Sequence, residues 1–351
     1  MTTNPALLGL ATAVPEHCLA TDDLVRAGHT VFAERGEDFA FFAPMFRNTG
    51  IEKRYSPVPL TWFLEPQDWP SRTRAFLDAA SALFRRTATA ALAEAGVGAG
   101  AIDTIVTVSS TGVATPSLEA RLLTELGFRA DVQRVPVFGL GCAGGVTGLS
   151  LATRLARANP GGHVLLVVIE LCTLAFRLDD FSARNMVATA LFADGAAAAV
   201  LGPAGANARL SLGESYEHTW PDTVDIMGWE MDPVGFGVIL SRSIPDFVGT
   251  HMRPTVIGAL AKGGRRLEDF AHLVFHPGGG KVLDALEAAF GFAPGQLKHE
   301  RAVLADYGNM SAPTALFILE RALAAGASGP GLMAALGPGF TASLLTYEVA
   351  R

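Results

Sequence analysis

VPVFGLGCAGGVTGLSLAT, residues 135–153, carries no charged side chain and holds five glycines and Pro136. A membrane-spanning helix needs about 20 mostly apolar residues, but the proline and the glycines divide this stretch into shorter elements. We predict a strand over VQRVPVF (132–138) and a helix over GGVTGLSLATRLARAN (144–159). Cys142 lies in the turn between these two elements.

The segments around this turn continue the alternation of strands and helices. Strands are predicted at 101–111, 163–170 and 193–203, and helices at 72–96, 117–128 and 182–192. Strands such as HVLLVVIE are apolar on both faces, which is typical of a sheet covered by helices. The first half of the chain is therefore predicted to be an α/β unit.

The second half repeats this layout. Helices are predicted at 245–264, at 281–291 and after YGNMSAPT (307–314), with strands at 272–279 and 341–350. Each half closes with a turn of small residues followed by a strand, ADGAAAAV (193–200) and GPGFTASLLTYEV (337–349). We predict a duplicated α/β architecture with halves 1–204 and 205–351, divided near GPAGAN (202–207).

Composition excludes several classes of protein. Half of the residues are hydrophobic and 17% are charged, so the chain is not a disordered tail. The net charge of −7, with no run of Lys or Arg, argues against nucleic acid as a partner. No secretory signal is visible near the first residue, and three cysteines do not make a disulfide framework. We expect a cytoplasmic protein that is not integral to a membrane.

The glycine cluster has two interpretations. Gly139, Gly141 and Gly144 match the G-x-G-x-x-G pattern of a nicotinamide dinucleotide site, with Glu170 as the acidic residue, although Glu170 lies 26 residues after Gly144 rather than about 20. Alternatively, Cys142 at the start of a helix is a nucleophile whose pKa is lowered by the helix dipole. A buried core cysteine is the simpler interpretation, but the small neighbours favour a nucleophile.

A nucleophilic cysteine needs a basic or cationic partner and an oxyanion donor. His276 follows the strand HLVF and precedes PGGG, and Asn309 lies in a polar turn before a helix. Taken singly, His276 is equally explained as a turn histidine and Asn309 as a helix cap. Both lie at ends of elements, where α/β proteins place their sites.

Three segments, in order, resemble the catalytic segments of type III polyketide synthases, the chalcone-synthase-like branch of the thiolase-fold condensing enzymes: GLGCAGG (139–145), HPGGG (276–280) and YGNMSAPT (307–314). ALFADGAAA (190–198) and GPGF (337–340) also resemble segments of this family. The resemblance covers nearly the whole chain. It implies a thiolase fold with layers in the order αβαβα and a homodimer.

The resemblance also implies roles for single residues. Cys142 would accept the acyl group, with His276 as its imidazolium partner and Asn309 as a side-chain donor. The substrates would be acyl-CoA and malonyl-CoA, with no cofactor and no metal. Substrate-binding positions would be Phe192, Ala175, Val238, Ser110, Gly337, Pro338 and Gly339, and CoA-binding positions Arg47, Lys281, Gly278 and Gly279.

Departures from the plant chalcone-synthase pattern indicate the product. Val238 replaces a gating phenylalanine and Ala175 a cavity threonine, and smaller residues there favour a long fatty acyl starter. YSPVPLTWFLEPQDWP (55–70) and MGWEMDPVGFGVILSRSIP (227–245) resemble bacterial alkylresorcinol and alkylpyrone synthases. We expect condensation of a fatty acyl-CoA with two or three malonyl-CoA units, followed by cyclisation.

Four other functions remain as alternatives. They are a chalcone or tetrahydroxynaphthalene-type synthase, an enzyme like ketoacyl synthase III, an NAD-dependent oxidoreductase, and a degenerate condensing fold that binds acyl-CoA without reaction. Pro277 after His276 favours the polyketide branch, because initiating ketoacyl synthases have a Gln-Ala-Asn type sequence there. The G-x-G-x-x-G pattern explains one segment, whereas the condensing-enzyme resemblance explains five.

Overall fold

The computed structural model describes residues 4–34, 39–205 and 207–350. The strands of the two halves join edge to edge in one sheet of order β11-β12-β13-β8-β1-β7-β6-β4-β5. The first half supplies β1 (Ala6–Ala13), β4 (Ile102–Val108), β5 (Gln133–Val137), β6 (His163–Leu171) and β7 (Asp194–Gly202). The second half supplies β8 (Leu210–Thr219), β11 (His272–Phe275), β12 (Gly329–Gly337) and β13 (Thr341–Val349).

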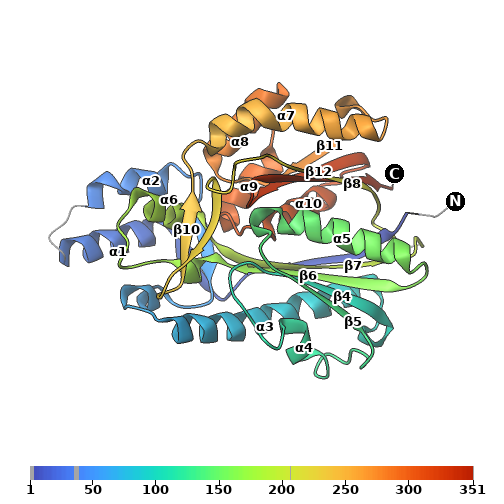
Figure 1. Cartoon of the computed structure of the whole chain (residues 1–351), viewed down its shortest axis with the longest axis horizontal. Coiled ribbons are helices and arrows are strands. Elements are labelled where there is room, and N and C mark those ends of the chain that lie inside the picture. The colour runs from blue at the N-terminus through green and yellow to red at the C-terminus, as the bar shows by residue number, and fades with distance from the viewer. Residues whose placement is uncertain (1–3, 35–38, 206, 351) are drawn as a thin grey trace.

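Helices cover both halves and fill the space between them (Figure 1). On one outer face α3 (Trp69–Ala95) packs on β1, β6 and β7, and on the other α7 (Ile244–Lys262) packs beside α8 (Gly280–Phe290). Between the halves lie α5 (Gly144–Ala158) and α10 (Thr314–Ala324), and α5 contacts strands of both halves. This is the layered thiolase-type α/β fold that the sequence predicted.

Small residues allow the layers to approach closely. The strand β7 contains four consecutive alanines, 196–199, which are fully buried. A Cβ atom on Gly9 of β1 would lie 2.3 Å from the carbonyl oxygen of Ala91 in α3. The alanines and the glycine at these positions therefore allow the layers to pack closely.

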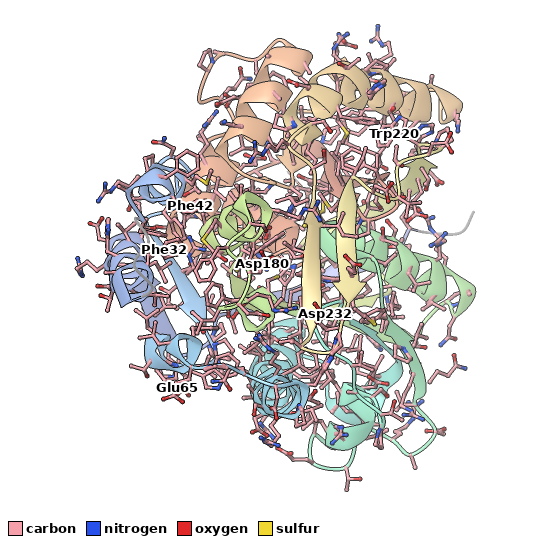
Figure 2. All side chains as sticks on the ribbon, turned by 60° about the vertical axis from the view of Figure 1, so that its left-hand side comes forward. Phe32, Phe42, Glu65, Asp180, Trp220 and Asp232 are labelled. Atoms are coloured by element: carbon pink, nitrogen blue, oxygen red, sulfur yellow. The ribbon has the colours of Figure 1, made fainter. Side chains whose placement is uncertain are left out.

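A group of smaller elements gathers at one end of the sheet (Figures 1 and 2). The helices α1 (Thr21–Glu34), α2 (Ala43–Arg47) and α6 (Ala183–Leu191) lie there, together with the small sheet of β2 (His17–Ala20) and β3 (Lys53–Ser56). The strands β9 (Met227–Met231) and β10 (Phe236–Leu240) form a separate hairpin. Figure 2 turns this end forward and labels Phe32, Phe42 and Asp232 within it.

Most predicted elements of the layered core are confirmed. The long helix α3 begins after Asp68, whose side chain accepts a hydrogen bond from the Ser71 amide, and ends at Gly96 with φ of 66°. The strands β1, β8 and β12, the helix α9 (Lys298–Tyr307) and the β9–β10 hairpin were not predicted from the sequence, and α4 (Leu118–Leu122) is shorter than predicted. None of the described helices is long and apolar enough to cross a bilayer. The boundary at residues 204 and 205 falls between β7 and β8 and stays a prediction.

Candidate active site

Cys142 occupies the junction between the two halves. It lies in a 3-10 turn, Gly141–Ala143, that leads directly into α5, and its side chain is buried. Gly141 has a positive φ of 47°, and its amide donates a hydrogen bond to Ser110 Oγ at 3.0 Å. The turn thus fixes the thiol at the amino-terminal end of the central helix, as the sequence predicted.

Asn309 and the His276 loop meet beside this turn. Asn309 follows Gly308, whose φ is 75°, and its Nδ2 donates to the carbonyl oxygen of Gly278 at 3.4 Å. Asn309 Oδ1 accepts from the Ser311 amide at 2.8 Å. His276 directly follows β11, and its amide donates to Ala334 O at 2.9 Å. The two ring nitrogens of His276 are buried and have no hydrogen-bond partner among the described residues.

Burial controls the protonation of the thiol and the imidazole. It raises the pKa of Cys142 to about 12, an effect that hydrogen bonds from Ser311 and Asn309 oppose. It lowers the pKa of His276 to about 3. The expectation that the helix end alone lowers the pKa of Cys142 is therefore wrong, because the loss of hydration outweighs the helix dipole. A thiolate in this position needs a cation beside it, which is the role that the resemblance implies for His276.

The glycines around Cys142 serve packing between the halves. A Cβ atom on Gly141 would lie 2.6 Å from the Pro338 ring, and one on Gly145 would lie 2.2 Å from Ala312 O. Glu170 is fully buried and accepts hydrogen bonds from the Ser110 amide and the Thr111 hydroxyl. A ribose hydroxyl has no access to such a carboxylate, so these contacts argue against the dinucleotide interpretation.

An apolar pocket lies near the turn that carries Asn309. Its walls include Phe192, Ala175 and Val238, three residues that the sequence analysis singled out, and it encloses about 990 Å³ when its open part is included. The side chains that line it are mostly aliphatic or aromatic, as in pockets that bind small-molecule ligands. Phe192 also connects the pocket to the catalytic segments, because its backbone pairs with that of Asn309. Phe192 thus lies between the pocket and the turn that carries Asn309, whereas Cys142, His276 and Asn309 do not line the pocket.

Arg54 is a residue of this site that sequence reasoning missed. It is 1% exposed and donates to the carbonyl oxygens of Thr189, Ala190 and Phe192, at the carboxyl end of α6. Burial lowers its pKa to about 10, and the nearby Asp194 carboxylate opposes this shift. Its charge therefore holds the end of α6 that carries Phe192. No local pattern marks it, since KRY in a short strand resembles a surface segment.

The other predicted positions fall in two groups. Gly337, Pro338 and Gly339 lie at the end of β12, and a Cβ on Gly337 would be 2.7 Å from the Ala143 side chain, so this turn packs on the nucleophile turn. Gly278 and Gly279 connect β11 to α8. Lys281 at the start of α8 and Arg47 in α2 are both exposed. The start of α8 lies near the segment that follows α2, because a Cβ on Gly280 would lie 3.2 Å from Thr49 O.

Comparison with known sequences matches both halves of the chain to the same family. Family models for the N-terminal and C-terminal domains of chalcone and stilbene synthases match residues 2–205 and 212–348. A 1,3,6,8-tetrahydroxynaphthalene synthase of Streptomyces peucetius subsp. caesius is 36% identical over 95% of this chain and 90% of its own length. A putative chalcone synthase of Bacillus subtilis is 31% identical over 97% of this chain and 98% of its own length.

Solved structures give the same result for the fold. The C-terminal type III polyketide synthase domain of Steely1 from Dictyostelium superposes with a TM-score of 0.91, at 26% identity, over 99% of this chain and 100% of that domain. The 1,3,6,8-tetrahydroxynaphthalene synthase of Streptomyces coelicolor superposes with a TM-score of 0.88, at 27% identity, over 99% of each chain.

Proposed function

Because this chain belongs to the chalcone and stilbene synthase family of type III polyketide synthases, which are acyltransferase-type condensing enzymes, we propose that its starter is a long-chain fatty acyl-CoA. The extender is malonyl-CoA, added two or three times, and the product is an alkylresorcinol or an alkylpyrone. The observation that carries this proposal is the apolar pocket that begins at Phe192, next to Asn309.

The first step loads the enzyme. The thiol proton of Cys142 moves to His276, and the resulting thiolate attacks the carbonyl carbon of the acyl-CoA thioester. The bond between that carbon and the CoA sulfur breaks, and the CoA thiolate leaves and takes up a proton. Since the thiolate and the imidazolium form together, the buried site carries no net charge during this step. This offsets the burial that disfavours each ion alone.

The second step extends the chain. Malonyl-CoA loses carbon dioxide, and the electron pair of the broken bond forms an enolate whose oxygen lies between His276 and Asn309. These two donors stabilise the negative charge as an oxyanion hole does. The enolate carbon attacks the acyl-cysteine carbonyl, and the Cys142 thiolate leaves. The product is a β-ketoacyl-CoA two carbons longer, ready for another round.

The pocket walls support a long alkyl chain as the starter. They are formed mainly by aliphatic and aromatic side chains from α1, α2, α6 and the β9–β10 hairpin, among them Val31, Phe32, Phe46, Met186 and Trp229. The charged side chains in this wall have partners, since Arg54 binds carbonyl oxygens and Arg177 binds Asp179 and Asp232. An alkyl chain needs no polar partner, and burying each methylene contributes about 0.8 kcal/mol.

Two further assignments rest on the resemblance. We propose that Arg47 and Lys281 contact the CoA phosphates, with Gly278 and Gly279 beside them. Arg47 lies two residues before Thr49, whose carbonyl oxygen faces Gly280 at the start of α8. We also propose a homodimer. Light scattering on the purified protein tests the dimer, and Lys281→Ala should raise the KM for malonyl-CoA without lowering kcat.

A second function is favoured by the relatives. Several of them are named tetrahydroxynaphthalene synthases, including the one at 36% identity. A tetrahydroxynaphthalene has no long alkyl side chain, so this alternative predicts a product from malonyl-CoA without any fatty acyl starter. The two functions therefore differ in their starter requirement.

The test is a starter panel read by mass spectrometry. Purified protein receives malonyl-CoA alone or with acyl-CoAs from acetyl to octadecanoyl, and CoA release is followed. We expect products that retain the alkyl chain of the long starters. A naphthalene product from malonyl-CoA alone would favour the second function, and no CoA release with any mixture would exclude both. Cys142→Ala is the control for background hydrolysis.

A further inference from the structure

One wall of the acyl pocket stands apart from the main sheet. The β9–β10 hairpin is a two-stranded sheet of its own, so no strand of the main sheet holds it in place. Trp229 and Val238 are register partners across this hairpin, and both line the pocket. The position of the hairpin therefore sets how wide the pocket is at this point.

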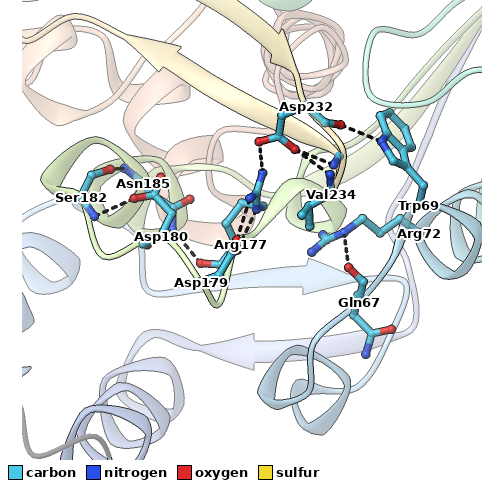
Figure 3. A network of polar contacts seen from close by, with 11 residues as sticks. Gln67, Trp69, Arg72, Arg177, Asp179, Asp180, Ser182, Asn185, Asp232 and Val234 are labelled. Atoms are coloured by element: carbon cyan, nitrogen blue, oxygen red, sulfur yellow. Dashed lines mark hydrogen bonds and ion pairs between the residues drawn. The ribbon is translucent and has the colours of Figure 1, made fainter.

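A single carboxylate shapes the tip of the hairpin (Figure 3). Asp232 Oδ1 accepts hydrogen bonds from the amides of Val234 and Gly235 at 2.8 and 3.0 Å, which closes the turn between the strands. The backbone oxygen of Asp232 accepts from Trp69 Nε1 at 2.9 Å, at the start of α3. The Trp69 ring also packs edge-on against Phe236, with centroids 5.2 Å apart.

The second oxygen of the same carboxylate reaches the facing segment. Asp232 Oδ2 accepts from Arg177 Nη1 at 2.5 Å, and Arg177 Nε and Nη2 donate to Asp179 at 2.9 and 2.8 Å. Arg177 lies two residues after Ala175, and both residues line the pocket. The Arg177 side chain is 11% exposed and that of Asp232 is 37% exposed. Asp232 thus connects two walls of the pocket while it closes its own turn.

We propose that the Asp232–Arg177 ion pair is a latch that fixes the hairpin across the acyl pocket and thereby limits the length and bulk of the starter. This rests on the proposed function, since the pocket must hold the acyl chain. Asp232 and Arg177 are positioning residues, because Trp229 and Val238 make the contact with substrate. A weaker latch lets the hairpin move outward and admits longer chains.

The chain offers a variant that separates the two roles of Asp232. Asp232→Asn keeps an oxygen for the Val234 and Gly235 amides, so the turn remains closed, but removes the charge that binds Arg177. Arg177→Gln breaks the same pair from the other side. The control is Arg85→Gln. Arg85 lies on α3, forms an exposed ion pair with Glu125, and is not among the residues that line the described pockets.

Two measurements test the latch. The first is the ratio of kcat/KM for hexadecanoyl-CoA to that for octanoyl-CoA, which should rise about fivefold in Asp232→Asn and in Arg177→Gln, as the loss of a partly buried ion pair implies. The second is hydrogen exchange of amides in residues 227–240, which should quicken by roughly tenfold in both variants, because a less restrained segment opens more often. Arg85→Gln should change neither.

The outcomes are distinguishable from those of the proposed function. In one outcome the wild type uses no fatty acyl-CoA, but hydrogen exchange of residues 227–240 quickens in both variants. The starter assignment then fails, and so does the proposal that the latch selects the starter. If the wild type uses fatty starters and the variants match it in both the kcat/KM ratio and exchange, the latch is wrong while the function stands. The latch would also be wrong if kcat fell equally for all starters in the variants while the kcat/KM ratio of hexadecanoyl-CoA to octanoyl-CoA stayed unchanged.

Discussion

The candidate catalytic segments and the apolar pocket lie close together but are built in opposite ways. Cys142, His276 and Asn309 occupy turns at the ends of core helices and strands, and their neighbours touch across the two halves. The pocket is enclosed by α1, α2, α6 and the β9–β10 hairpin, which lie outside the layered core. The arrangement of the candidate catalytic residues therefore depends on backbone geometry. The shape of the pocket depends on the side chains of short helices and of the hairpin.

This difference suggests how the two regions tolerate change. Close backbone contacts, such as that of Gly145 with Ala312 O, leave no space for a larger residue beside the nucleophile. Pocket walls made of side chains accept another side chain at the cost of a different ligand shape. We expect substitutions in the catalytic segments to abolish reaction, and substitutions in the pocket to redirect it.

The largest effect is expected at the nucleophile. Cys142→Ala should lower condensation about 10⁴-fold or more, because no acyl-enzyme forms, while decarboxylation of malonyl-CoA continues. His276→Ala and Asn309→Ala should lose decarboxylation as well, since they remove the donors to the enolate oxygen. Carbon dioxide release and product formation are measured separately. Unchanged activity in Asn309→Ala would contradict its assignment.

The next effect concerns Arg54, which connects the two regions. Arg54→Met should lower the free energy of unfolding by about 3–5 kcal/mol, because it leaves three carbonyl oxygens and the Asp194 carboxylate without their cation. Denaturant titration gives the value. Arg184→Met, an exposed arginine on the same helix α6, is the matched control and should stay within about 0.5 kcal/mol of the wild type. If both variants lost less than about 0.5 kcal/mol in the free energy of unfolding, a structural role for Arg54 would be refuted.

A third prediction tests the thiol and imidazole pair by pH. In His276→Ala no imidazole can take the thiol proton, so burial, which raises the pKa of Cys142, acts without an ion pair to oppose it. A raised pKa leaves the thiol protonated at neutral pH, so alkylation by iodoacetamide should be at least about a hundredfold slower than in the wild type at pH 7. Its rate should rise about tenfold per pH unit up to pH 10 without a plateau. Identical pH profiles for the two proteins would exclude the pair.

The smallest effect is expected in the pocket wall. Val238→Phe places a ring opposite Trp229 and should lower kcat/KM for hexadecanoyl-CoA about tenfold, with little change for short starters. The control is Ile239→Phe, the next residue of β10, which does not line the pocket. Competition between two acyl-CoAs, read by mass spectrometry, gives the ratio. Equal shifts in both variants would mean that the hairpin is distorted rather than the pocket filled.

The layered core could be predicted because its signals are local. Apolar strands such as HVLLVVIE, helices with clear ends such as α3 with Asp68 and Gly96, and the turns around Cys142, His276 and Asn309 are all visible in short stretches of sequence. The strand β12 was missed because its run, GPGLMAALG, contains Gly, Pro and Ala, which have low strand propensity, and pairing with β11 and β13 decides its state.

The sequence by itself determined the fold class and the family, and it predicted three residues of a catalytic site. The tertiary structure alone decided that Arg54 holds the end of α6, that the glycines near Cys142 serve contact between the halves, and that Asp232 joins the hairpin to Arg177. It also reversed the expected pKa shift of Cys142. The physical reason is that burial and long-range polar contacts depend on segments far apart in the chain, whereas turn and helix signals depend on neighbours.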